Sequence, residues 1–303
     1  MSPPASPPLR SYLLLHFLVL IWGFTAILGL LISVSPVALV LYRTVLAAVG
    51  LAVVLYVQKK KFALPRTDAV RMLLVGFLLS MHWILFFASA RVATASVCLA
   101  GMSTTSLWTS LVEPAINRQR IRPLEVGLGL VAVAGLYIVF RFEFDHATGL
   151  LLALGSAVLA ALFTVFNSHL VRRYDAFLIT FYEMIGASIC SVLFVLLFQA
   201  MGWTEGTSLW PRATDWLWIL VLAWVCTVYA YSMGTHLMKQ FSAYMVNLTV
   251  NLEPVYGIAL AFLIFGEKER MTTGFYLGTL VILLAVLAYP LLTKWQIKVR
   301  KNA

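Results

Sequence analysis

Residues Phe241 to Arg270 read FSAYMVNLTVNLEPVYGIALAFLIFGEKER. At roughly 1.5 Å per residue, the run from Phe241 to Phe265 is long enough to cross a hydrocarbon layer of about 30 Å. Its middle holds Glu253-Pro254. A carboxylate and a proline at membrane depth are costly unless they face protein or a water-filled cavity. The stretch therefore predicts a membrane helix whose centre does not face lipid.

The composition of the whole chain indicates the same class. Of 303 residues, 62% are hydrophobic and only 11% are charged, and the mean hydropathy is +0.93. Ordinary globular domains carry about 25% charged residues. The charges here lie in short clusters between long apolar runs, which is typical of a polytopic helical membrane protein. Three cysteines all lie inside apolar runs and indicate no disulfide framework: Cys98, Cys190 and Cys226.

The apolar runs predict an all-α membrane protein with ten spans. We expect a disordered, Pro/Ser-rich cytoplasmic arm at 1–11 and a basic cytoplasmic tail at 294–303. The polar loop Glu143 to Thr148 divides the spans into two sets of five, over 12–141 and 148–293. The predicted spans are 12–33, 36–57, 70–90, 93–115, 123–141, 148–170, 176–200, 214–236, 241–265 and 272–293.

The Lys and Arg positions predict the orientation. If the N-terminus is cytoplasmic, 16 of the 22 Lys and Arg residues fall on the cytoplasmic side and 5 on the other, with Arg43 inside a span. This asymmetry is a strong positive-inside signal. It predicts that both termini lie in the cytoplasm, and the basic net charge of +10 needs no nucleic acid to explain it.

The two sets of five spans are also similar to each other. A shift of 140 residues places Tyr42-Arg43 on Tyr182-Glu183, and a shift of 147 places His82 on Tyr229. Five is an odd number, so the two halves must have opposite orientations. Inverted repeats with a substrate site near the midplane are an architecture of secondary transporters.

Several short motifs, in order, resemble a known family. They are Trp22-Gly23, Tyr42-Arg43, Ala93-Thr94-Ala95-Ser96 with its counterpart Ser242-Ala243, and Phe265-Gly266-Glu267 after a proline. Together they resemble the EamA branch of the drug/metabolite transporter superfamily over about residues 12–293. The fourth span departs from the commonest pattern, since Ser106-Leu107 replaces the mid-helix proline. The resemblance implies a carrier in the plasma membrane, typically an exporter of amino acids or other small metabolites that works by alternating access.

Two helical stripes of polar residues are candidates for substrate binding. Ser103 and Ser106 belong to a serine stripe in 93–115 that ends at Glu113. Such a stripe serves either close helix packing or a wet surface. Tyr244, Asn247 and Asn251 share a face of 241–265. Those amides suit either bonds between helices or a polar substrate. In an unbroken helix Glu253 points away from that face and need not belong to the same site.

Further lining candidates come from other spans. His82 and its repeat partner Tyr229 are expected to line a cavity with Phe86, although a lone helix histidine can equally bond to a neighbouring helix. Trp22 and Asn167 are candidates from the first and sixth spans. The predicted substrate-binding set is Trp22, His82, Phe86, Ser103, Ser106, Asn167, Tyr229, Tyr244, Asn247 and Asn251.

Charged residues inside the spans have separate predicted roles. Arg43 and Glu183 occupy equivalent positions with opposite charge, so they form a structural ion pair or each bond to a different neighbour. Glu113 and Glu253 are candidates for proton coupling. We hypothesise that Glu113 is protonated from outside and releases its proton inside during export, which a Glu113→Gln variant with intact pH dependence would contradict.

Rival functions have less support from the residues. The spans contain no His-Glu-x-x-His, Gly-x-Ser-x-Gly or paired aspartates, so an intramembrane enzyme lacks catalytic groups. We expect no cofactor and no metal. A passive channel or facilitator for small neutral metabolites fits the same repeats and stays the alternative to a carrier. The expected partners are a small-molecule substrate and the lipid bilayer.

Overall fold

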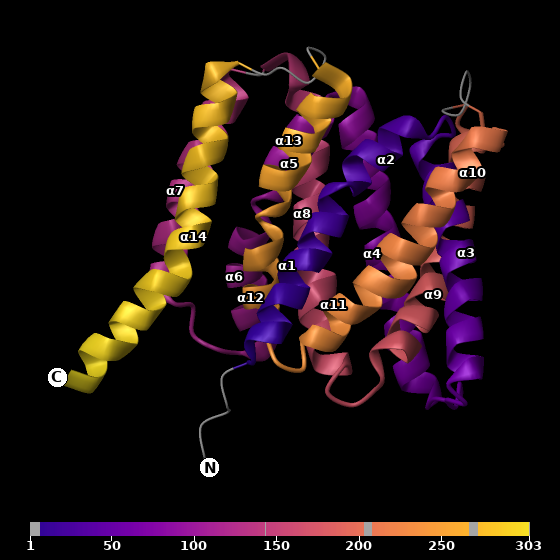
Figure 1. The fold of residues 1–303 in the computed structure, drawn as a ribbon, viewed down its shortest axis with the longest axis horizontal. Helices are drawn as coiled ribbons and strands as arrows, with labels where there is room; N and C mark the ends of the chain where they lie inside the picture. The colour runs from indigo at the N-terminus through magenta and orange to yellow at the C-terminus, as the bar shows by residue number, and fades with distance from the viewer. Residues whose placement is uncertain (1–6, 143, 203–207, 267–271, 303) are drawn as a thin grey trace.

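The computed structural model describes residues 7–142, 144–202, 208–266 and 272–302 (Figure 1). Every regular element in those ranges is helical. The first half contains α1 (Leu9–Gly23), α2 (Thr25–Leu31), α3 (Pro36–Val57), α4 (Arg66–Val92), α5 (Ala95–Met102), α6 (Thr105–Asn117) and α7 (Pro123–Phe142). The second half contains the 3₁₀ turn η1 (Phe144–His146), α8 (Ala147–Leu170), α9 (Ala176–Ala200), α10 (Ala213–Leu220), the π-helix η2 (Val221–Tyr231), α11 (Ser232–Leu237), α12 (Ala243–Val250), α13 (Glu253–Phe265) and α14 (Thr273–Asn302).

Within the described ranges these helices join end to end into ten rods, five in each half, as the sequence predicts. Over the described residues, seven of these rods are long and apolar enough to cross a membrane. Three predicted boundaries need correction. Helix α1 begins at Leu9 rather than at 12, so 9–11 of the arm predicted as disordered are helical, while 1–6 lie outside the described residues. Helix α4 begins at Arg66 rather than at 70, and α14 continues to Asn302 rather than ending at 293. The Lys, Arg and Gln residues beyond the apolar part of α14 are good helix formers, so the helix does not stop where hydropathy falls.

Two rods are broken at equivalent places in the two halves. The rods α5–α6 and α12–α13 each consist of an eight-residue helix, a two-residue break and a thirteen-residue helix. In the first, the hydroxyls of Ser103 and Thr104 bond back to the carbonyls of Ala100 and Gly101 at 2.6 and 2.8 Å. In the second, Pro254 lies in the first turn of α13, where its missing N–H has no intrahelical partner to lose. The breaks bring helix ends to the middle of the molecule.

Glycines set the distance between the two halves where α4 crosses α9. A Cβ added at Gly76 would lie 2.1 Å from the carbonyl oxygen of Glu183, and one added at Gly186 would lie 2.2 Å from that of Leu73. The backbones therefore touch directly, as small residues permit in membrane helices. A hydrogen bond of 2.9 Å between the Ser80 and Ser191 hydroxyls lies further along the same crossing.

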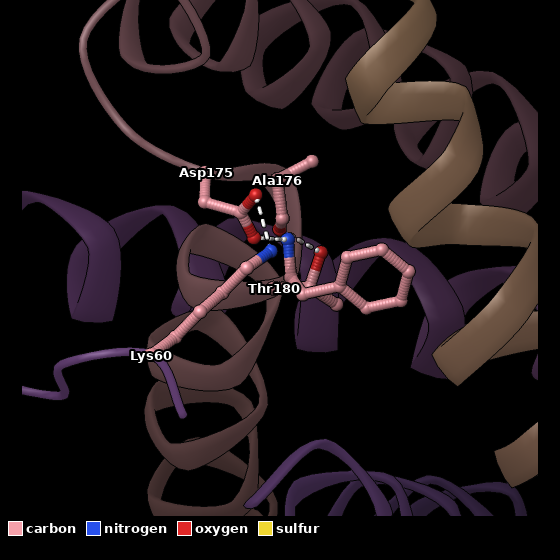
Figure 2. A network of polar contacts seen from close by, with 5 residues as sticks. Lys60, Asp175, Ala176 and Thr180 are labelled. Atoms are coloured by element: carbon pink, nitrogen blue, oxygen red, sulfur yellow. Dashed lines mark hydrogen bonds and ion pairs between the residues drawn. The ribbon is translucent and has the colours of Figure 1, made fainter. Parts of the chain in front are cut away.

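Polar contacts also join the halves at both ends of α3. After α3, Lys60 Nζ lies 2.7 Å from the carboxylate of Asp175, which also accepts the Phe177 N–H at the start of α9 (Figure 2). Before α3, the Ser33 N–H donates to Asp215 at 3.1 Å. An ion pair as exposed as Lys60–Asp175 contributes about 0–1 kcal/mol. Their role is to fix the two halves against each other around a shared interior.

Candidate functional site

A cavity of about 90 Å³ lies between the two halves at the middle of the bundle. One water needs roughly 10–15 Å³ of such space, so the cavity has room for a small metabolite rather than a large one. Its walls are rich in aromatic rings: Trp22, Trp83, Phe86, Phe163 and Tyr231. Polar side chains interrupt these walls at Thr25, Arg43, His82, Thr105, Thr164, Thr235, Asn247 and Glu253. An apolar pocket with few convergent polar groups is typical of small-molecule sites.

Arg43 of α3 is the cation of this cavity. Its Nε donates to the Thr227 hydroxyl at 2.9 Å, and its guanidinium carbon lies 3.8 Å from the centroid of the Trp83 ring. The side chain is 2% exposed. Stacking on tryptophan stabilises a guanidinium and fixes its plane. Among the described residues no carboxylate lies within ion-pair distance of Arg43, so the ion pair with Glu183, one of the two alternatives left open by the sequence, is not formed in this structure.

Glu253 is the carboxylate of the same cavity. It begins α13, and the two-residue break before it interrupts the regular helical spacing from α12. Glu253 and Asn247, which an unbroken helix would point in different directions, therefore both line the cavity. Glu253 is 6% exposed, and none of the ion pairs and hydrogen bonds found among the described residues involves it. The cavity wall thus carries an arginine and a carboxyl group that do not pair with each other.

His82 of α4 both lines the cavity and bonds to α8. Its Nδ1 lies 2.9 Å from the Ser156 carbonyl and 2.7 Å from the Ser156 hydroxyl, which itself donates to the His82 carbonyl at 2.9 Å. Because a carbonyl can only accept, the proton of the neutral ring belongs on Nδ1, and Nε2 is left as an acceptor. The two readings of this histidine that the sequence left open are therefore compatible.

The two asparagines of α12 and the break after it have different surroundings. Asn247 lines the cavity, donates to the Thr109 hydroxyl at 2.8 Å and accepts from the Thr164 hydroxyl at 3.3 Å. Asn251 donates to the Ser106 hydroxyl at 2.6 Å and lies outside the cavity wall. The Ser103 hydroxyl donates to the carbonyl of Ala100 in the preceding turn of its own rod. Ser106 and Asn251 therefore connect the two broken rods, and Asn247 alone of this group reaches the cavity.

The prediction that Tyr229 lines the cavity needs correction, because the structure places this residue on the outer surface. Its side chain is 42% exposed, and Tyr231 lines the cavity instead. The reason is η2, in which hydrogen bonds span five residues and each residue turns less than in an α-helix. The Thr227 hydroxyl bonds the Leu222 carbonyl five residues earlier, at 2.8 Å. A shift derived from ordinary helices therefore selects the wrong tyrosine.

The other predicted site residues lie near the cavity but do not line it. Asn167 donates to the Tyr231 hydroxyl at 2.8 Å, and Glu183 is buried next to these two groups. Among the described residues, neither carboxylate oxygen of Glu183 has a hydrogen-bond partner. Tyr244 lies at a separate small hollow near Ser106. Its N–H donates to the Glu113 carboxylate at 3.2 Å, so Glu113 accepts a bond at the start of α12.

Trp22 and Phe86 both line the cavity, and three residues of the site were not predicted. The Trp22 indole N–H donates to the Cys226 carbonyl at 3.4 Å, which places the ring against Gly234. Trp83, Thr227 and Tyr231 were missed. A buried arginine always needs partners, and this requirement was the one available signal for Trp83 and Thr227.

Comparisons with known proteins agree with this architecture. The sequence model of the EamA-like transporter family matches residues 9–141 and again 147–289. An uncharacterized transporter of Archaeoglobus fulgidus is 23% identical over 184 residues, which are 60% of this chain. The match covers 66% of that relative, just under two thirds of its length. A solved structure described only as the crystal structure of a protein superimposes with a TM-score of 0.69 and 17% identity, over 94% of this chain and 99% of that one.

At 17% identity the structural likeness establishes the fold alone. The two family matches cover nearly the entire chain and coincide with the two halves seen in the structure. The chain is therefore a multi-pass membrane protein of the EamA-like transporter family, within the drug/metabolite transporter superfamily.

Proposed function

We propose that this protein is a secondary-active exporter of amino acids or similarly small zwitterionic metabolites, working by alternating access. The observation that carries the proposal is the presence of Arg43 and Glu253, from different halves, on the wall of one cavity without a shared ion pair. A zwitterion supplies the counter-charge that each of these groups lacks. A cargo without a carboxylate would leave Arg43 uncompensated, and a cargo without an ammonium group would leave Glu253 to take a proton instead.

Arg43 is suited to the carboxylate of the cargo. Thr227 and Trp83 occupy its Nε and one face of its plane, and the terminal nitrogens remain as donors. Two parallel N–H donors match the two oxygens of a carboxylate. Because the side chain is already fixed, little rotamer entropy is lost when the cargo binds.

Glu253 is suited to the ammonium group of the cargo, and Asn247 and Thr105 provide further polar atoms. The aromatic walls receive an apolar side chain, such as that of a small or medium amino acid. Glu253 can take either a proton or the cargo ammonium. Competition between the two at one carboxylate is a simple way to exchange cargo for protons.

Alternating access is supported by the two broken rods. Their breaks lie at the cavity wall, where α5 meets α6 and α12 meets α13. Inverted repeats of this kind allow one half to rock against the other around a fixed site. We further propose a plasma-membrane location with both termini cytoplasmic. Its support is that α1 begins and α14 ends at the same end of the bundle (Figure 1), next to the basic linkers.

The test is transport by purified protein in proteoliposomes with labelled amino acids outside and unlabelled ones inside. We expect saturable uptake that internal amino acid stimulates. Arg43→Gln and Glu253→Gln each remove a charge-assisted hydrogen bond worth about 1.5–3 kcal/mol. This loss corresponds to roughly a 10- to 150-fold lower apparent affinity. Glu113→Gln is the matched control, because Glu113 lies outside the cavity.

Two outcomes would contradict the proposal. Flux that is linear in concentration and indifferent to internal substrate would favour the passive facilitator, which the same cavity also suits. Saturable transport with an equal loss in Glu253→Gln and Glu113→Gln would remove Glu253 from the binding site and leave the zwitterion hypothesis without its anion.

A further inference from the structure

A second hollow, of about 750 Å³, lies on the outer surface where α4 and α8 run side by side. It follows α4 from Arg71 to Leu78, a length of roughly 10 Å at the rise of an α-helix. Leu74 is 58% exposed and Phe166 is 37% exposed, so the hollow faces outward and not into the bundle. It is separate from the central cavity, with which it shares no lining residue.

The hollow has an apolar floor and a basic end. The floor consists of Leu74, Val75, Phe77, Leu78, Phe166 and Leu170. The basic end, which we call the arginine rim, consists of Arg71, Arg172 and Arg173, with His169 beside them. The rim lies where α4 begins and α8 ends, next to the linker between α8 and α9.

One carboxylate lies in this rim, and it is already engaged. Asp68 accepts a bond from Arg71 at 3.0 Å and another from the Tyr174 hydroxyl. The bond to Asp68 raises the pKa of Tyr174, so its hydroxyl stays protonated and keeps donating. Arg172 and Arg173 have no carboxylate within ion-pair distance among the described residues. Three arginines against one carboxylate leave the rim with an excess of positive charge.

We propose that this hollow is a binding site for an anionic phospholipid. The floor faces the hydrocarbon of the bilayer and receives an acyl chain, while Arg172 and Arg173 bind the headgroup phosphate. Charge complementarity argues for this occupant, because a zwitterionic lipid brings its own cation to a rim that already has an excess of them. Basic pockets between membrane helices on the cytoplasmic side are suited to such headgroups.

Occupancy of the site would also affect the carrier. The floor is made of α4 and α8, and the inner faces of the same helices contribute His82, Trp83, Phe163 and Thr164 to the central cavity. A lipid seated between the outer faces therefore contacts one helix from each half. Its retention is expected to influence how these helices move against each other.

The experiment measures lipid retained by the full-length protein in detergent, by native mass spectrometry. The probes are phosphatidylglycerol and phosphatidylcholine with identical acyl chains. The variant of the arginine rim, called the groove variant below, is Arg172→Gln/Arg173→Gln. The control variant is Lys61→Gln/Arg120→Gln. The control removes two exposed charges from other linkers at the same end of the bundle, outside the hollow.

We expect the wild type and the control to retain phosphatidylglycerol in preference to phosphatidylcholine. At about 1 kcal/mol per basic residue, the groove variant should bind phosphatidylglycerol roughly 30-fold more weakly. Thermal unfolding of each variant without lipid checks that the fold is intact. An equal loss in both variants would overturn the proposal in favour of unspecific charge attraction. Competition by millimolar inorganic phosphate alone would overturn it in favour of a soluble anion.

Discussion

Replacing Gly186 by alanine tests the closest contact between the two halves. The new Cβ would lie 2.2 Å from the Leu73 carbonyl oxygen, whereas ordinary contact begins at 3.4 Å. The atom in the way is backbone, so α4 and α9 must separate by about 1.2 Å. Overpacking of this kind lowers the free energy of unfolding by about 1–3 kcal/mol, and the higher helix propensity of alanine offsets up to ~1 kcal/mol of that loss. The separation also weakens the Ser80–Ser191 bond on the same crossing.

The control is Gly127→Ala on α7, where nothing lies within 4 Å of the added Cβ. This variant gains helix propensity without a clash, so it should be neutral or more stable by up to ~1 kcal/mol. The assay is thermal unfolding in detergent, followed by tryptophan fluorescence. Since 1 kcal/mol shifts the midpoint by roughly 2–4 °C in proteins of 150–250 residues, we expect Gly186→Ala to unfold several degrees below Gly127→Ala. Equal midpoints would refute direct backbone contact between α4 and α9.

Three further predictions concern the cavity. Gly234→Ala places a Cβ 2.7 Å from the Trp22 ring, so transport should fall several-fold while the unfolding midpoint changes by only a few degrees; normal transport would mean that the position of Trp22 is unimportant. Tyr231→Phe removes the hydroxyl that accepts from Asn167 and should lower apparent affinity, whereas Tyr229→Phe on the outer surface should not, as concentration-dependent uptake will show. Glu253→Gln should abolish any dependence of uptake on a pH gradient, and Glu113→Gln should keep it; the reverse result would restore Glu113 as the proton carrier.

Hydropathy and charge alone predicted the ten spans and the two halves, and they did so for a direct reason. Each span must satisfy its own backbone hydrogen bonds in lipid, so it has to be a helix of about 20 apolar residues. Such a run is visible in the sequence without knowledge of its neighbours. Intramembrane polar residues were visible for the same reason, since Arg43, His82, Asn247 and Glu253 stand out in apolar surroundings.

The grouping of these residues depended on helix irregularities that hydropathy does not reveal. The break between Val250 and Glu253 turns Glu253 into the cavity with Asn247, and the π-helix η2 replaces Tyr229 by Tyr231. Both change the angular relation between residues of one rod. Residues assigned to one face on the assumption of a regular helix are therefore misplaced at the positions that line the site.

The sequence by itself determined that this protein is a helical membrane protein of two related halves, because solvation in lipid acts on each span separately. The tertiary structure decided which charged groups share a cavity and which bond elsewhere. Arg43 donates to Thr227 and stacks on Trp83 rather than pairing with Glu183, and the Glu113 carboxylate accepts a hydrogen bond from the N–H of Tyr244. These partners come from other rods, up to 184 residues away in the chain. Only the packing of whole helices, set by contacts such as those of Gly76 and Gly186, brings such groups together.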